Sequence, residues 1–166
     1  GVLDEREWET ARKIDTFYEV FPYSLKEISD FKTDILIFEN PDGIYIGFKN
    51  YQSNESMRSQ NHERDDEMSL ADKNGVSIDF DADGLIAYQF FVSSGGSIGD
   101  ATYTNETEKS NDWDGDWLSA TTIGEDVWFT EFFIPWSIAP MKKQLGDKRK
   151  VKIGFYRMLA GYSRVI

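Results

Sequence analysis

Short hydrophobic segments recur along the chain, separated by polar turns, and some alternate with the two-residue period of half-buried β-strands. The clearest case is the segment 75–81, where Val76, Ile78 and Phe80 alternate with polar residues. Other segments rich in β-branched and aromatic residues, which favour strands, are 33–39, 44–49, 86–92, 101–104, 118–123, 127–134 and 151–157. These short strands, without long helices between them, predict an all-β fold: a two-sheet β-sandwich of the immunoglobulin-like or jelly-roll-like kind.

Turns, loops and two short helical segments separate the predicted strands. The turn sequence Asn-Pro-Asp-Gly at 40–43 predicts a hairpin. Residues 52–72 lack apolar periodicity and predict a long polar loop. A short N-terminal helix is predicted over 4–13, where an Asp can cap the start and Arg and Lys lie near the end. One helical turn is expected over 137–143.

The length indicates a single domain over residues 1–166, long enough to bury a sizeable core. The chain contains no internal repeat and no low-complexity linker. It begins with Gly1 rather than Met and ends soon after a predicted strand, so we expect it to be a fragment of a longer protein.

The charge balance narrows the range of partners. Thirty acidic residues against eighteen basic ones give a net charge of −12. That field repels phosphate backbones and anionic lipid heads, which argues against nucleic acid or membrane-surface partners and leaves neutral ligands or cations. The absence of cysteine excludes disulfides, thiol nucleophiles and zinc–cysteine sites.

The segment Trp113-Asp114-Gly115-Asp116-Trp117 is the strongest candidate for ligand chemistry. An exposed indole covers the apolar face of a sugar while neighbouring carboxylates accept hydrogen bonds from its hydroxyls. A structural interpretation stays open, in which Trp117 begins a strand within the core and Trp113 covers a loop. Trp128 and Trp136 are interpreted as structural.

Two acidic groups are candidates for binding Ca²⁺, which takes about six to eight oxygen ligands. One is Asp65 with Asp66 in the polar loop, and the other is Asp79, Asp81 and Asp83 around a turn. The second group is not an EF-hand, because counting from Asp79 puts Phe90 where that loop needs a bidentate Glu. The alternative is that these are solvated turn acids.

The sequence shows no enzymatic motif. It lacks a Ser-His-Asp signature and a glycine-rich phosphate loop. No pair of carboxylates stands out for glycoside hydrolysis. The one histidine, His62, lies in the polar loop and is expected to be exposed. We therefore predict a protein that is not an enzyme.

Several short motifs occur in a fixed order from one end of the chain to the other. They are GVLDEREWETA at 1–11, DGIYIGF at 42–48, Arg64-Asp65-Asp66, Asp72, VSIDFD at 76–81, AYQFFV at 87–92, Gly96 with Asp100, WDGDW at 113–117 and WFTEFFIPW at 128–136. The series resembles family 9 carbohydrate-binding modules, in particular the type that precedes an uncharacterised barrel-like domain in exported bacterial proteins.

The resemblance implies a β-sandwich, export to the periplasm, outer membrane or cell surface, and a structural Ca²⁺ of the kind known in the sugar-binding relatives. The predicted ligand-binding residues are Trp113, Asp114, Asp116 and Trp117, together with Arg64. Where the sugar-binding modules carry an aromatic residue, a polar residue and an Arg against the sugar, this chain has Leu70, Ser77 and Phe91.

Two functions follow as predictions. The first is a non-catalytic carbohydrate-binding-like module of an exported, envelope-associated bacterial protein, with a poly- or oligosaccharide as partner. The second is a structural or interaction domain that docks on the C-terminal barrel-like domain of the same protein without binding sugar.

Overall fold

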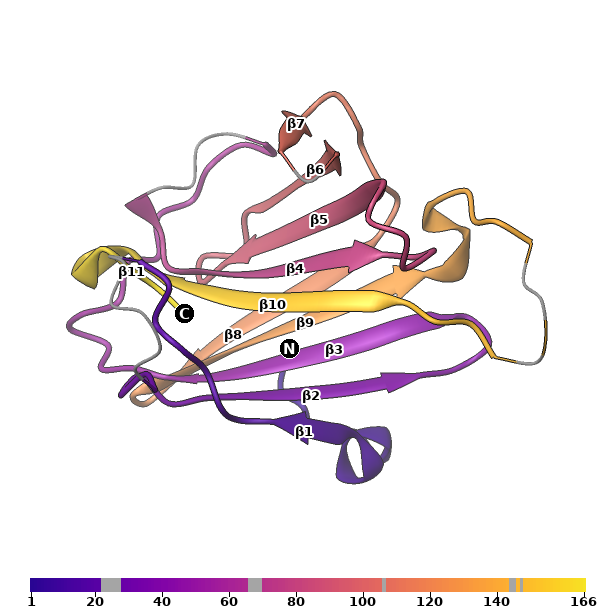
Figure 1. The fold of residues 1–166 in the computed structure, drawn as a ribbon. Coiled ribbons are helices and arrows are strands. Elements are labelled where there is room, and N and C mark those ends of the chain that lie inside the picture. Colours follow the sequence, from indigo (N-terminus) through magenta and orange to yellow (C-terminus); the bar gives the residue numbers. More distant parts are fainter. Residues whose placement is uncertain (22–27, 66–69, 106, 144–145, 147) are drawn as a thin grey trace.

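Two antiparallel sheets pack face to face in the computed structural model (Figure 1), which confirms the predicted sandwich. It describes residues 1–21, 28–65, 70–105, 107–143, 146 and 148–166. The five-stranded sheet has the order β1 (Arg12–Ile14), β2 (Thr33–Glu39), β3 (Gly43–Tyr51), β9 (Val127–Pro135) and β8 (Leu118–Gly124). The six-stranded sheet has the order β11 (Arg164–Val165), β10 (Lys152–Leu159), β4 (Lys73–Asp79), β5 (Ile86–Ser93), β6 (Ile98–Thr104) and β7 (Glu108–Ser110).

The predicted hairpin joins β2 to β3 in antiparallel register, with Glu39 opposite Ile44. The Asn40 side-chain oxygen accepts hydrogen bonds from the backbone N–H groups of Asp42 and Gly43, at 2.9 and 3.1 Å. Asn at the first position of a turn makes this bond because its short amide reaches the backbone two residues later. The turn prediction is therefore confirmed with its mechanism.

The predicted N-terminal helix is the main correction. A five-residue 3-10 helix, η1 (Arg6–Thr10), replaces it, and the chain then enters β1. Trp8 is buried in η1 and packs edge-on against Phe38, with ring centroids 4.8 Å apart. Pairing of β1 with β2 thus overrides the local helical preference. The turn expected over 137–143 is a shorter 3-10 helix, η3 (Trp136–Ile138), placed directly after β9.

The inner faces of the two sheets form one hydrophobic core. Its fully buried members include Ile46, Phe48 and Phe132 from the five-stranded sheet and Ile78 and Phe90 from the six-stranded sheet. Burying a side chain of this kind stabilises the fold by roughly 1.5–3 kcal/mol. The alternation seen in the sequence is the alternation between this core and the outer faces.

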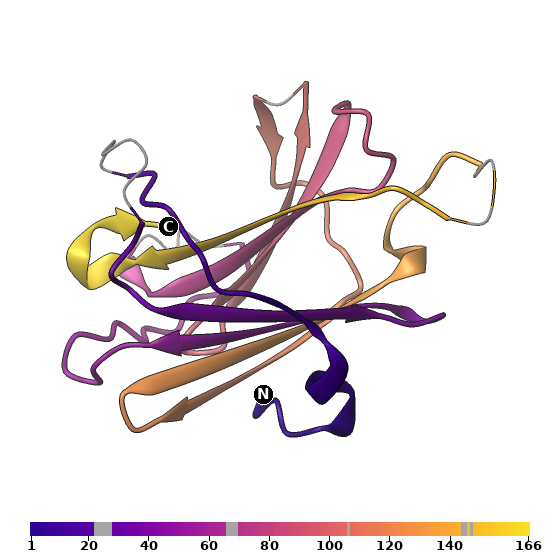
Figure 2. The ribbon, with the colours of Figure 1, turned by 60° about the horizontal axis from the view of Figure 1, so that its bottom comes forward.

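The two ends of the sandwich differ. At the end where β3 and β10 finish, the buried guanidinium of Arg157 donates to the Thr33 hydroxyl at 2.9 Å and to the Gln52 side-chain oxygen at 2.7 Å. Burial lowers the pKa of Arg157 to about 10, so it stays charged at neutral pH. At the other end, β2 and β9 finish and β10 begins, and the chain connects η3 to β10 there (Figures 1 and 2). None of the helices among the described residues has the length and apolar character needed to cross a membrane.

Candidate functional site

A cleft of about 830 Å³ opens at this second end of the sandwich. Sites for small ligands span about 300–1,000 Å³ and combine an apolar lining with a few polar groups. The apolar lining includes Trp136, Met141 and Val151, and the charged lining is Glu39, Lys148 and Arg149. These residues come from the end of β2, from η3 and from the connection that leads into β10.

Two hydrogen bonds, one from the indole and one from the backbone, fix Trp136 at the cleft. Its indole Nε1–H donates to the carbonyl of Asn40 at 2.8 Å, and its backbone N–H donates to the carbonyl of Asp42 at 3.1 Å. The ring is half-buried, packing on the hydrophobic core while also lining the cleft. The structural role predicted for Trp136 is therefore confirmed, and cleft lining is added to it. Trp128 is fully buried, as predicted.

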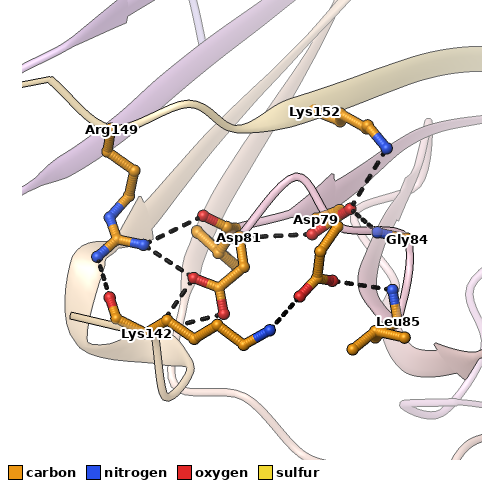
Figure 3. Close-up of polar contacts among 9 residues, drawn as sticks. Asp79, Asp81, Gly84, Leu85, Lys142, Arg149 and Lys152 are labelled. Atoms are coloured by element: carbon orange, nitrogen blue, oxygen red, sulfur yellow. Dashed lines mark hydrogen bonds and ion pairs between the residues drawn. The ribbon is translucent and has the colours of Figure 1, made fainter. Parts of the chain in front are cut away.

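The turn that carries Asp79, Asp81 and Asp83 lies beside the cleft (Figure 3). The Asp81 carboxylate accepts hydrogen bonds from the Arg149 guanidinium at 2.9 Å and from the backbone N–H of Lys142 at 3.0 Å. The Asp83 carboxylate accepts one from the Lys142 ammonium, and Asp79 lies 4.0 Å from the Lys152 ammonium. The three predicted metal ligands thus face three cationic side chains.

This network fixes one wall of the cleft. The Arg149 guanidinium also donates to the Lys142 carbonyl at 2.7 Å, which ties the two ends of the connection together. The bond from Lys142 lowers the pKa of Asp83, and the same bond raises the pKa of Lys142. The turn acids therefore position the segment that carries Arg149 to the cleft. Ca²⁺ binding at these acids stays a prediction.

A second polar cluster forms around the buried carboxylate of Asp100. The Arg64 guanidinium lies 2.7 Å from Asp100, 3.1 Å from Asp114 and 3.7 Å from Asp65. The three carboxylates each offer an oxygen within 4.8 Å of the others, the one such group among the described residues. The predicted partner Asp66 lies outside those residues.

Arg64 supplies the positive charge of this cluster. One Asp100 oxygen also accepts from the Gly115 N–H at 2.9 Å and from the Trp117 indole at 2.8 Å. The other oxygen is buried and has no hydrogen-bond partner in the structure. Desolvation by burial raises the pKa of Asp65. Residues predicted separately as ligand-binding and metal-binding are thus brought together around Asp100, which sequence reasoning had placed in neither set.

The indoles of the predicted Trp113–Trp117 site pack inward. Trp117 is 5% exposed, stacks on Phe132 with centroids 5.8 Å apart, and meets Phe90 edge-on at 5.3 Å. Trp113 is half-buried and meets Tyr88 edge-on at 4.8 Å. The structural interpretation of Trp117 is confirmed, since no open ring face is left for a ligand. Asp114 and Asp116 are exposed beside it.

The outer face of the six-stranded sheet carries the positions that hold sugar in the resembling modules. The Tyr156 ring covers Gly75 so closely that a Cβ there would lie 1.8 Å from its Cζ atom. Phe91 meets Tyr156 edge-on at 5.6 Å, and the Lys73 and Lys109 ammonium groups lie 5.3 and 5.8 Å from the Phe91 ring centre. Burial raises the pKa of Tyr156 well above its usual value. The Phe91 and Tyr156 rings therefore occupy the part of this face around Gly75.

No protein-family model and no curated protein matches the sequence. Solved structures do match the fold. A family 9 carbohydrate-binding module from Caldicellulosiruptor kristjanssonii in complex with cellotriose matches with a TM-score of 0.59 at 13% identity, over 98% of this chain and 73% of that one. The fold is that of a family 9 carbohydrate-binding module.

Two further structures agree. A candidate carbohydrate-binding protein from Bacteroides uniformis ATCC 8492 matches with a TM-score of 0.71 at 14% identity, over 95% of this chain and 76% of that chain. The Caldicellulosiruptor kristjanssonii module in complex with glucose matches with a TM-score of 0.56 at 14% identity, over 92% and 68% of the two chains. At this identity the likeness establishes the fold and transfers no site residue.

Sequence reasoning missed most of the cleft. Glu39 ends β2, while Lys148 and Arg149 are neighbours in the segment before β10, so the three share no local motif. One signal was visible: the stretch from 142 to 152 is unusually rich in Lys and Arg for an acidic chain. Two of these basic residues, Lys148 and Arg149, line the cleft in the structure.

Proposed function

We propose that this domain binds a saccharide without chemical change and that the ligand lies in the Trp136 cleft. The observation that carries the proposal is an indole ring lining a cleft of about 830 Å³ whose rim carries charged groups. The shared fold with carbohydrate-binding modules supports it. On the sequence resemblance, we place the domain in an exported, envelope-associated bacterial protein.

The lining suits a sugar ring. An indole covers the apolar face of a pyranose, while polar groups at the rim exchange hydrogen bonds with its hydroxyls. The Glu39 carboxylate can accept such bonds and the Lys148 ammonium can donate them. Neither has a side-chain partner among the described residues, so a ligand need not displace one.

The same lining argues for binding rather than hydrolysis. Glycoside hydrolysis uses two carboxyl groups on either side of the scissile bond. Among the described lining residues, Glu39 is the one carboxylate. A single acid at the rim can orient a hydroxyl but cannot supply both the acid and the base.

The test is isothermal titration calorimetry with cellotriose and with the best ligands from a glycan array. We expect at least one saccharide to bind and Trp136→Leu to weaken its binding about tenfold, because aromatic contacts contribute about 0.5–1.5 kcal/mol beyond burial. Phe91→Leu, on the outer sheet face, is the matched control and should bind normally. Absence of binding to every glycan, or equal loss in the control, would contradict the proposal.

A second candidate function is favoured by an exposed apolar cluster near β11. Its members Tyr18, Val20 and Phe21 are each about half exposed, and Val20 and Phe21 contact Val165 through backbone hydrogen bonds. Apolar side chains gathered on a surface mark contact sites for other proteins. This cluster suits docking on another domain, including the C-terminal barrel-like domain. Burial of the cluster in a longer form of the protein, measured by hydrogen exchange, would support docking, and unchanged exchange would argue against it.

A further inference from the structure

The wall of the cleft is basic although the protein as a whole is acidic. The chain carries a net charge of −12, with eighteen basic residues against thirty acidic ones. A third of the basic residues fall in the stretch from 142 to 152: Lys142, Lys143, Lys148, Arg149, Lys150 and Lys152. Only one acid, Asp147, interrupts this stretch, and it lies outside the described residues.

Half of these cations are balanced by the turn acids. Lys142 pairs with Asp83, Arg149 with Asp81 at 2.9 Å, and Lys152 with Asp79 at 4.0 Å. The three remaining ones are exposed and have no ion-pair partner among the described residues: Lys143, Lys148 and Lys150. The described part of this stretch therefore carries a surplus of positive charge, and of these three lysines Lys148 is the one that lines the cleft.

Lys148 places part of this positive charge where a ligand in the cleft would contact it. It lines the cleft together with Trp136, while the neighbouring Arg149 is anchored by Asp81 and by the Lys142 carbonyl. The ammonium group is a mobile donor that suits a carboxylate, and a bond between two charged partners is roughly twice as strong as a neutral one. Glu39 contributes an acceptor for hydroxyl groups.

We infer that the saccharide bound in this cleft is acidic, with a uronic-acid carboxylate placed against Lys148. The inference rests on the proposed function and names its ligand class. The Trp136 indole packs against the apolar face of the sugar ring, Lys148 pairs with the sugar carboxylate, and Glu39 accepts a hydrogen bond from a sugar hydroxyl. A neutral sugar would leave the surplus charge of the wall unused.

The test compares trigalacturonate with its methyl ester, which has the same rings without the charges. By titration calorimetry in low salt we expect the acid to bind about tenfold more tightly than the ester, as for hydrogen bonds to charged groups. That advantage should shrink at high salt, because exposed charges are screened. Lys148→Gln should abolish the advantage, while Lys109→Gln on β7, with the same change of net charge, should keep it.

The outcomes separate this inference from the function on which it rests. Equal affinity for acid and ester, or binding of cellotriose alone, overturns the acidic ligand and leaves saccharide binding intact. Binding of the acid that does not depend on Lys148 overturns the placement of the carboxylate. Failure of trigalacturonate, its ester, cellotriose and every glycan of the array to bind overturns both.

Discussion

The Trp113–Trp117 segment and the Trp136 cleft contain the same kinds of residue and differ in what covers them. Each combines at least one indole ring with a carboxylate and a basic side chain. In the first, Trp117 is 5% exposed and the charges of Arg64 and Asp100 are paired. In the second, Trp136 lines open space and part of the positive charge is unpaired.

The surroundings of each indole explain the difference. The Trp117 indole donates to the buried Asp100 carboxylate, and its ring packs against Phe132 and Phe90. The Trp136 indole donates to a backbone carbonyl of the β2–β3 turn, at the rim of the sandwich. A Trp beside acids in a sequence is therefore not enough to indicate a sugar site, because tertiary packing decides which ring face stays free.

The largest expected effect is a difference in the free energy of unfolding when the Trp of each region is replaced by Ala. Trp117→Ala should lower the free energy of unfolding by about 3–5 kcal/mol, since it empties a large buried site. Trp136→Ala should lower it by about half as much, because its ring is only partly packed and part of its area is already open to solvent. Urea unfolding of both variants measures this difference, and equal losses would contradict the contrast between a core ring and a cleft ring.

Removing a carboxylate charge from the Asp100 cluster should give the next largest change in the free energy of unfolding. Asp100→Asn should lower the free energy of unfolding by about 2–4 kcal/mol, because it leaves Arg64 without its buried partner. The matched change Asp114→Asn should alter it by less than about 1 kcal/mol, since the Asp114 side chain is 72% exposed. Denaturant titration checks both variants. A larger loss for Asp114 would show that the buried carboxylate does not organise the cluster.

Loosening the cleft wall should affect binding more than stability. Asp81→Asn removes the charge that anchors Arg149, and we expect saccharide affinity to fall about three- to tenfold, since a misplaced wall loses oriented contacts. The free energy of unfolding should change by only about 0–1 kcal/mol, as for a partly exposed ion pair. Calorimetry and urea unfolding on the same variant test this prediction. Unchanged affinity would show that the network of Figure 3 does not position the binding site.

The smallest effect is a pH dependence of the same wall. The bond from Lys142 lowers the pKa of Asp83 below the usual value of 3.8. A lowered folded-state pKa stabilises the fold above the unfolded-state pKa, and this contribution is lost as the pH falls through the folded-state value. The ion pair should thus stay intact from neutral pH down to about pH 4 and break below it. Carbon NMR of the Asp83 carboxyl measures the midpoint, and Lys142→Gln should raise it; a midpoint above 3.8 in the unaltered protein would contradict the pairing.

Much of the fold was predictable because it rests on local patterns. The strand over 33–39 has the bounds that its β-branched and aromatic residues predict, and the turn at 40–43 forms the expected hairpin. The missed strands β1, β7 and β11 have two or three residues each, too few to show a period. The N-terminal helix predicted over 4–13 is shortened to the 3-10 helix Arg6–Thr10, because residues 12–14 pair with β2 instead.

The site was less predictable because it is assembled from distant parts of the chain. Asp65 and Asp114 were assigned to different sites, and only the fold brings both to Arg64 and Asp100. Glu39 and Lys148 meet at one cleft although more than a hundred residues separate them in the sequence. Residue types indicate which chemistry is available, but the exposed face of each ring depends on tertiary packing.

The most direct test of the central claim uses the five indole N–H signals of the protein, one for each Trp. In a proton–nitrogen NMR titration with trigalacturonate, the Trp136 indole and the backbone amides of Met141, Lys148 and Val151 should shift together. The Trp113 and Trp117 indoles should stay in place. Shifts at Trp113 and Trp117 with an unmoved Trp136 would contradict the account and return the site to the segment that sequence alone suggests.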